Sequence, residues 1–302
     1  MKTKHKNLNE KPTKNDVSCL QNIKNRNFRD MKHKSIGNTE GKILSAFIKK
    51  GRNWFTITEA CSLFPELSKN AINIQLPRMT EDGLLMRIRE GTYYIIPYEQ
   101  DSETFMPNWH LLAAPLGCGE HYIGYYSALQ IHNLITQPSL KEQIVINRRI
   151  KPSEKNIKDV KFQFIYHNEK HFFGYKKMWI DSFNKVYCSD LEKTIIDCLY
   201  KPDYAGGIVE IAKAIFLSKD KINYEILLKY VLQFDTQIVI KRLGYLLELL
   251  QIDTPIIQIL YGKRSSSVAL LDTESPKSGK IFTRWSIQQN ADIETIKSSI
   301  LT

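Results

Sequence analysis

The spacing of apolar residues predicts three short helices near the start of the chain. Thr56 or Thr58 can cap the second helix, which ends before Pro65, and Ser68 can cap the third, which ends at Gly83. In each helix the apolar residues form one stripe at intervals of three or four positions. The stripes are Ile43, Leu44, Phe47 and Ile48, then Ala60, Leu63 and Phe64, and finally Ile72, Leu76 and Met79.

After the third helix the pattern becomes that of strands. Two such runs, 84–89 and 92–97, flank the turn Glu90-Gly91 and predict a β-hairpin. Three helices followed by a hairpin are typical of a winged helix-turn-helix, which we expect over residues 37–99. In that motif the third helix enters the DNA major groove, and the hairpin lies over the neighbouring phosphates.

Polar and basic side chains on the third helix and the hairpin are the candidate DNA contacts. Asparagine can form two hydrogen bonds with adenine, and arginine can contact phosphate oxygens. Pro77 conflicts with a continuous helix, because it removes a backbone hydrogen bond and costs about 3 kcal/mol unless the helix bends. The predicted DNA-binding residues are Ser68, Lys69, Asn70, Asn73, Arg78, Arg87, Arg89 and Tyr93.

The rest of the chain predicts a second domain that contains both strands and helices. Residues 100–120 mix proline, glycine and isolated apolar residues, as a connector does. Over residues 121–302 strands mostly precede helices, which favours an α+β fold over a doubly wound sheet. Helices are expected at 122–134, 191–200 with Asp190 as cap, 207–216, 224–232 and 236–250. Strands are expected at 143–147, 160–166, 177–180, 185–188, 256–261, 268–271 and 282–287.

The net charge of +11 is concentrated near the N-terminus. Residues 1–40 hold ten lysines and arginines against four acidic residues, so we expect a basic disordered arm over residues 1–36. Such an arm is either a solvated tail or a contact to DNA phosphates. Five scattered cysteines indicate reduced thiols, and no apolar run suits a membrane helix or a secretory signal. We therefore expect a cytoplasmic protein without a membrane partner.

Other polar residues have the chemistry of catalytic or metal sites but simpler explanations. Asp190, Glu192 and Lys193 are close enough to suggest a metal-dependent nuclease, yet Asp190 suits a helix cap and the other two a solvated or ion-paired first turn. His167 and His171 lack a second ligand pair for a tetrahedral metal site. The same holds for the set His110, Cys118 and His121. We expect no catalytic residue, no metal and no cofactor.

A wide apolar face on residues 236–250 predicts a buried helix, in which Gly244 lets another element approach closely. Charge alone suggests a second basic surface in the same region, able to touch flanking DNA or an acidic face of a partner protein. The candidate residues of this surface are Lys241, Arg242, Lys263 and Arg264.

Four segments together resemble the AbiEi antitoxins of bacterial abortive-infection, or type IV, toxin–antitoxin systems. Three of them are YIGYYSALQIHNL at 122–134, SDLEKTIIDCL at 189–199 followed by Pro202 and Gly206-Gly207, and RLGYLLELL at 242–250. The fourth is the winged helix ahead of them, so the resemblance spans residues 40 to about 250. The chain departs from the family in its long basic arm, at Pro77, and at Asn133, where a glycine is common.

The resemblance implies a repressor of its own operon that takes part in phage defence and is not an enzyme. It implies two partners: double-stranded operator DNA, and a cognate nucleotidyltransferase-like toxin that the C-terminal domain counters directly or functionally. The residues themselves leave two alternatives open. One is a metal-dependent nuclease that the winged helix targets to DNA, and the other is a transcriptional regulator whose C-terminal domain senses a ligand.

Overall fold

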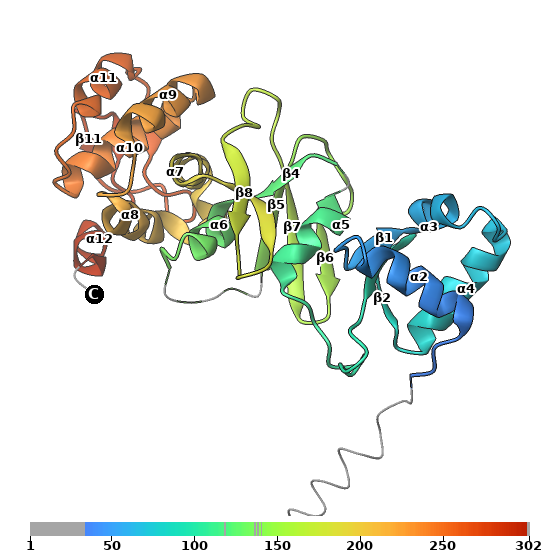
Figure 1. The fold of residues 1–302 in the computed structure, drawn as a ribbon. Coiled ribbons are helices and arrows are strands. Elements are labelled where there is room, and N and C mark those ends of the chain that lie inside the picture. Colours follow the sequence, from blue (N-terminus) through green and yellow to red (C-terminus); the bar gives the residue numbers. More distant parts are fainter. Residues whose placement is uncertain (1–33, 118, 136, 138, 140, 301–302) are drawn as a thin grey trace, which may run out of the picture. The chain divides into compact units, whose positions relative to one another are not determined.

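The computed structural model describes residues 34–117, 119–135, 137, 139 and 141–300. The chain divides after Phe105 into two compact units (Figure 1). Residues 1–33, most of the expected basic arm, lie outside the described residues. Both units combine helices with strands, so the protein is of mixed α and β structure, which agrees with the expected α+β class. None of the helices within these ranges is both long and apolar enough to cross a bilayer.

The N-terminal unit combines helices with a small antiparallel sheet. Its helices are α2 (Asn38–Ile48), α3 (Ile57–Leu63) and α4 (Lys69–Glu81). Its strands lie in the order β1 (Trp54–Thr56), β3 (Thr92–Ile95), β2 (Leu85–Arg89). The expected helices and hairpin are confirmed close to their predicted positions, whereas the short strand β1 is not among the predicted elements.

Local signals set the starts of two of these helices. Thr56 and Glu59 form a capping box, in which Thr56 Oγ1 accepts from the Glu59 N–H at 3.2 Å and Glu59 accepts from the Thr56 N–H at 2.8 Å. Ser68 Oγ accepts from the Ala71 N–H at 3.1 Å and caps α4. Most residues of the three predicted apolar stripes then meet in one core, whereas Ile48 and Leu63 are 53% and 36% exposed. Its fully buried members include Ile43, Phe47, Phe55, Ala60, Ile72, Leu76 and Met79.

The C-terminal unit is built on a six-stranded mixed sheet in the order β6-β7-β5-β4-β9-β8. The pairs β5–β7 and β4–β9 are parallel, and the other pairs are antiparallel. The edge strand β6 and the three-residue strand β4 are absent from the sequence expectations. The strands are β4 (His121–Ile123), β5 (Lys141–Ile146), β6 (Glu154–Ile157), β7 (Val160–Tyr166), β8 (Tyr175–Trp179) and β9 (Lys185–Ser189).

Helices cover the two sides of this sheet. Figure 1 shows α7 to α11 gathered on one side, with α5 on the other. Helix α5 (Ala113–Gly117) and the 3-10 helix η1 (Trp109–Leu112) lie within the segment expected to be a connector. The helices on the side of the sheet opposite α5 are α6 (Tyr125–Ile131), α7 (Leu191–Tyr200), η2 (Pro202–Tyr204), α8 (Gly207–Ser218), α9 (Tyr224–Phe234), α10 (Gln237–Leu249), α11 (Ile256–Lys263) and α12 (Ile293–Ser299).

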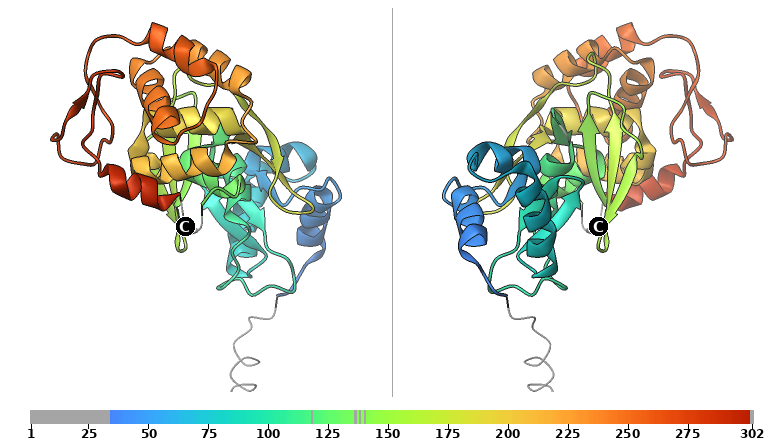
Figure 2. Two further views of the ribbon diagram at one scale, coloured as in Figure 1. Left: turned by 90° about the vertical axis from the view of Figure 1, so that its left-hand side faces the viewer. Right: turned by 90° about the vertical axis from the view of Figure 1, so that its right-hand side faces the viewer.

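A second, very small sheet lies beside the helices (Figure 2). Its strand order is β10 (Ala269–Leu270), β12 (Ile287–Gln288), β11 (Ile281–Phe282). Three predictions in this unit are wrong. Residues 282–287, expected as one strand, hold the end of β11 and the start of β12 with a turn over 283–286 between them. Residues 256–261, expected as a strand, belong to helix α11, and the expected helix over 122–134 begins with residues of strand β4. Both are short apolar runs, for which periodicity does not separate a strand from a buried helix.

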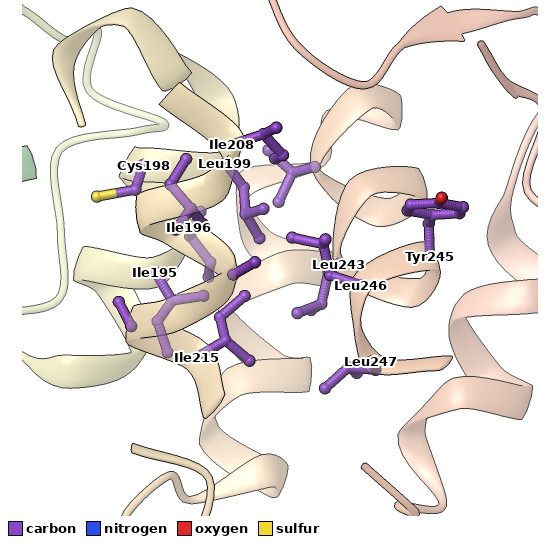
Figure 3. Close-up of a cluster of buried hydrophobic side chains, with 14 of the residues drawn as sticks. Ile195, Ile196, Cys198, Leu199, Ile208, Ile215, Leu243, Tyr245, Leu246 and Leu247 are labelled. Atoms are coloured by element: carbon purple, nitrogen blue, oxygen red, sulfur yellow. The ribbon is translucent and has the colours of Figure 1, made fainter. Parts of the chain in front are cut away.

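The main hydrophobic core lies between helices α7, α8 and α10 (Figure 3). Leu199 and Ile208 meet Leu243 and Leu246 there, and all four side chains are at most 1% exposed. Helix α10 is buried along nearly its whole length, which agrees with its predicted wide apolar face. The close approach expected at Gly244 is also confirmed, because the fully buried ring of Trp285 packs directly against this residue.

Replacing Gly244 by alanine should lower the free energy of unfolding by about 1–3 kcal/mol, as overpacking of a core does. A Cβ atom at this position would overlap the six-membered ring of Trp285. This penalty outweighs the gain in helix propensity, which is about 1 kcal/mol. Gly262 in α11 is the matched control, because a Cβ there meets nothing within 4 Å. Urea unfolding should show Gly262→Ala unchanged or slightly more stable, and an equal loss in both variants would contradict the packing argument.

Candidate nucleic-acid interface

Helix α4 separates its residues sharply between core and solvent. Ile72, Leu76 and Met79 are fully buried, one turn apart along the inner side. The predicted contact residues on the opposite side, Asn70, Asn73 and Arg78, are all exposed, as are Lys69 and the capping residue Ser68 at the start of the helix. The expected polar flank of the third helix is therefore present and accessible within its own unit.

An apolar residue also lies on this outer flank of α4. Ile74 is 57% exposed and follows Asn70 by one helical turn. Ile74 is not among the predicted DNA-binding residues, although the helical spacing places it on the same face as Asn70. An exposed aliphatic side chain beside Asn70 can contact a thymine methyl group when the helix lies in a major groove.

Two further features position the outer flank. The side-chain amide of Gln75 donates to Glu40 at 2.6 Å and ties α4 to α2. Pro77 does not end the helix, which continues to Glu81, and its ring is on the exposed side. There the lost backbone bond leaves the carbonyl of Asn73 facing solvent instead of the core, which limits the penalty.

Only one of the two hairpin arginines predicted to contact DNA is fully exposed. Arg87 is exposed, whereas Arg89 is half-buried, and the pairing of β2 with β3 shifts register between them. Such an irregularity turns successive side chains in different directions. Arg87 is thus the accessible cation of this strand.

Tyr93 is not a surface residue, so its assignment to the DNA contacts is wrong. It is 5% exposed, and its ring stacks on Phe55 with centroids 6.1 Å apart. The physical reason is that β3 is the central strand of its sheet, with every residue buried. A residue of such a strand has no solvated face from which to contact DNA.

The prediction of a second basic surface is wrong for two of its four residues, which are buried. Lys241 and Arg242 are fully buried in α10. The Lys241 ammonium donates to the carbonyl and hydroxyl of Ser267, and Arg242 Nη1 donates to the Leu199 carbonyl at 2.7 Å. Backbone carbonyls that no helix or strand uses thus hold these cations inside the protein. Burial lowers the pKa of Arg242 to about 10.

The other two residues of that set remain nearer the surface. Lys263 is exposed at the end of α11. Arg264 is half-buried, lies over the ring of Tyr261 at 4.0 Å from its centroid, and donates through Nε to the Arg284 carbonyl at 2.5 Å. With Lys241 and Arg242 inside the core, the four residues do not form one surface.

The acidic residues at the start of α7 serve the fold. Asp190 caps the helix by accepting from the Lys193 N–H at 2.9 Å, as predicted, and Glu192 accepts from the Asn223 N–H at 2.8 Å. Glu192 and Lys193 were expected to be solvated or ion-paired: neither is solvated, because they are 8% and 0% exposed, whereas the ion pair is confirmed for Lys193, whose partner is Asp197. These groups do not present paired carboxylates to solvent as a metal-dependent nuclease would require.

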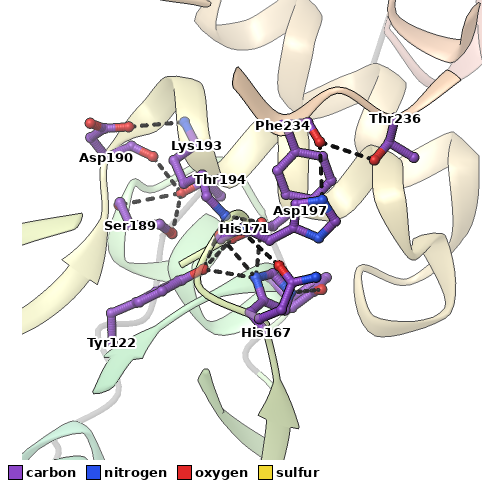
Figure 4. Close-up of polar contacts among 12 residues, drawn as sticks. Tyr122, His167, His171, Ser189, Asp190, Lys193, Thr194, Asp197, Phe234 and Thr236 are labelled. Carbon is purple, nitrogen blue, oxygen red and sulfur yellow. Dashed lines mark hydrogen bonds and ion pairs between the residues drawn. The ribbon is translucent and has the colours of Figure 1, made fainter. Parts of the chain in front are cut away.

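A buried polar network surrounds Lys193 (Figure 4). Its ammonium pairs with Asp197 one turn along α7 and donates to Tyr122 Oη at 3.0 Å. Tyr122 in turn donates to Asp197 at 3.0 Å, and Tyr125 Oη lies 2.8 Å from His167 Nε2. The ring faces of three aromatic residues enclose the ammonium. They are Tyr122, Phe173 and Phe234, with centroids 5.2–5.4 Å from Nζ.

Burial dominates the electrostatics of this network. It lowers the pKa of Lys193 and raises the pKa of Asp197, and the mutual attraction of the two charges opposes both shifts. Burial and the nearby Lys193 charge lower the pKa of His167 to about 2, so its ring is neutral at physiological pH. Every member is enclosed, and the network therefore acts on the packing of α7 against the sheet.

The residues considered as metal ligands are not brought together. His110 Nδ1 contacts Glu142 at 2.9 Å in a buried pair, far along the chain from His167 and His171. Cys118 lies outside the described residues. Within the described ranges, no three histidine, cysteine or carboxylate side chains are arranged as ligands of one ion.

Comparison with known proteins identifies a solved structure that has a similar fold. The structure matches the crystal structure of RV2827C protein from Mycobacterium tuberculosis with a TM-score of 0.65 and 12% sequence identity, over 91% of this chain and 98% of that one. No family model and no curated protein matches the sequence. At this identity the likeness shows that the two chains share a fold across nearly their whole lengths.

Proposed function

We propose that the N-terminal unit is a winged helix-turn-helix that binds double-stranded DNA, and that the protein is an AbiEi-type antitoxin and autorepressor. The element order helix, strand, two helices and a hairpin is the order expected of that motif. The observation that carries the proposal is the outer flank of α4, where Lys69, Asn70 and Asn73 are exposed on a helix anchored by three buried apolar residues.

In this proposal each accessible side chain has a distinct role. Asn70 and Asn73, in the N-terminal half of α4, read base edges, with adenine as the preferred partner of an asparagine amide. Lys69, Arg78 and Arg87 contact phosphates, which positions the helix without reading sequence. Ser68 holds the start of the helix through its cap.

The proposal is tested by measuring affinity for the native promoter and for an unrelated duplex of equal length. Asn70→Ala and Asn73→Ala should each weaken promoter binding about 5- to 150-fold, the equivalent of about 1–3 kcal/mol per base contact, and leave the unrelated duplex unchanged. Arg87→Ala should weaken binding to both duplexes and reduce the slope of log affinity against log salt by about 0.9.

Two variants serve as controls for these measurements. Tyr93→Phe should leave affinity unchanged, because the ring is in the core. Lys221→Ala removes an exposed lysine of the C-terminal unit and should also be neutral. If both asparagine variants keep the promoter preference of the unchanged protein, α4 is not the reading helix. If the unchanged protein ignores the promoter even in dilute salt, DNA binding itself is excluded.

The antitoxin part of the proposal rests on the family resemblance and is tested separately. A nucleotidyltransferase-type reading frame directly downstream should arrest growth when expressed alone, and co-expression of this protein should restore growth. Continued arrest in the presence of well-expressed protein would contradict the antitoxin role and leave the DNA-binding result standing.

A further inference from the structure

The hairpin of β8 and β9 carries aromatic and basic side chains in an unusual arrangement at the edge of the six-stranded sheet. Trp179, Phe183 and Tyr187 are 59%, 90% and 40% exposed, and Lys177 and Lys185 are exposed beside them. Large aromatic residues are normally removed from water, so three on one hairpin call for an explanation. We refer to these five residues as the hairpin strip.

The strand register gives the strip a definite pattern. Lys177 pairs with Tyr187, and Trp179 pairs with Lys185, so aromatic and basic residues alternate across the two strands. Paired and diagonal side chains on one face of a sheet lie about 5–8 Å apart. The Lys185 ammonium lies 4.2 Å from the Trp179 ring centroid and the Lys177 ammonium 5.5 Å from that of Tyr187. The result is two aromatic platforms, each with a cation at its side.

The tip of the hairpin is held rigidly. The Asp181 carboxylate accepts from the backbone N–H groups of Phe183 and Asn184, both at 2.8 Å, and from the Asn184 amide. Phe183 therefore projects from a closed turn. The one acidic residue of the hairpin is used in this turn, while Lys176, Lys177 and Lys185 leave the hairpin with an excess of positive charge.

We propose that the hairpin strip binds single-stranded nucleic acid, with bases stacked on Trp179 and Tyr187 and phosphates beside Lys177 and Lys185. Interleaved aromatic and cationic side chains on an open sheet surface are how sheet-based proteins hold unpaired strands. Stacking of one base changes affinity about 5- to 150-fold, whereas an exposed cation–π contact is equivalent to about 2- to 5-fold. A base can therefore displace a lysine from a ring face and release it for a phosphate.

A protein strand added to the edge of β8 is the competing occupant, and the residues of β8 disfavour it. Lys176 and Lys177 occupy two successive positions of this edge strand. Lysines on an edge strand oppose pairing with another strand, since the charges would lie against the incoming backbone. The same charges attract a polyanion.

A hollow next to the hairpin gives room for one base turned away from the strip. It has a volume of about 590 Å³ and is bordered by Trp179, Ile180, Trp109 and Asn133. The Trp109 indole N–H is buried and has no acceptor among the residues that the structure describes.

The test uses the full-length protein and a fluorescent oligothymidine or oligouridine of about 12 nucleotides, within the usual size of such sites, in about 50 mM salt. Trp179→Ala should weaken binding about 5- to 150-fold, and Trp179→Phe, which keeps a ring, should restore most of it. The double variant Lys177→Glu/Lys185→Glu should weaken binding further and lower the salt slope by about 1.4, which corresponds to two phosphate contacts on a single strand.

A matched control separates this surface from general charge effects. Lys221→Glu/Lys229→Glu changes the net charge equally at two exposed positions elsewhere and should leave the salt slope unchanged. Promoter-duplex affinity should be unaltered by Trp179→Ala, so failure of this inference and failure of the proposed duplex binding are distinguishable. Equal loss in the control and strip variants, or an affinity for both oligonucleotides weaker than about 100 µM, overturns the proposal.

Discussion

Replacing Lys193 by methionine should lower the free energy of unfolding by about 3–5 kcal/mol, the usual result of breaking a buried ion pair from one side. Both Lys193 and Asp197 have fully buried side chains. Without the ammonium, the Asp197 carboxylate would keep the hydrogen bond from Tyr122 but lose its charged partner. Urea unfolding at neutral pH measures the loss.

The double variant Lys193→Met/Asp197→Leu gives the decisive comparison. Removing both charges also removes the cost of burying them, so the double variant should be more stable than the single one. The exposed ion pair of Lys170 with Asp235, at 2.7 Å, is the matched control, and Lys170→Met should cost about 1 kcal/mol or less. Similar losses for Lys193→Met and Lys170→Met would show that the α7 pair is solvated.

Acidification from pH 6.5 to pH 5 should lower the free energy of unfolding by about 2 kcal/mol through His167 alone. Its pKa is about 2 in the folded protein and about 6.5 in the unfolded chain. A depressed folded-state pKa means that the unfolded chain binds the proton more tightly. The stabilisation is therefore complete above pH 6.5 and is lost by about 1.4 kcal/mol for each pH unit below it.

His167→Gln isolates this contribution from its neighbours. The charged or titratable groups around His167 include Lys193, Lys201, His171 and Asp197. Asp197, whose pKa is raised, binds protons in the folded state and opposes the acid destabilisation. Thermal melts from pH 7.5 to pH 5 should show a shallower loss in His167→Gln than in the unchanged protein. Parallel curves would mean that the pKa of His167 is the same in the folded protein as in the unfolded chain.

The outer flank of α4 illustrates what could be predicted of the candidate site. Its caps, its apolar stripe and its exposed polar residues all follow from signals within about 15 consecutive residues. Tyr93 was misplaced because its burial depends on β1, a three-residue strand too short to leave a periodic pattern. The hairpin strip could not be predicted for a related reason, because the pairing of Trp179 with Lys185 depends on the register of two strands.

The sequence by itself determined the elements whose signals are local. These include the capped starts of α3, α4 and α7, and the wide apolar face of α10. Only the tertiary structure decided which charges are inside. Lys193 and Asp197 meet Tyr122, which lies 75 positions from Asp197, and Arg242 meets the carbonyl of Leu199. A charge is tolerated in the core only where distant groups supply its partners, and helical spacing carries no information about groups that the chain brings from elsewhere.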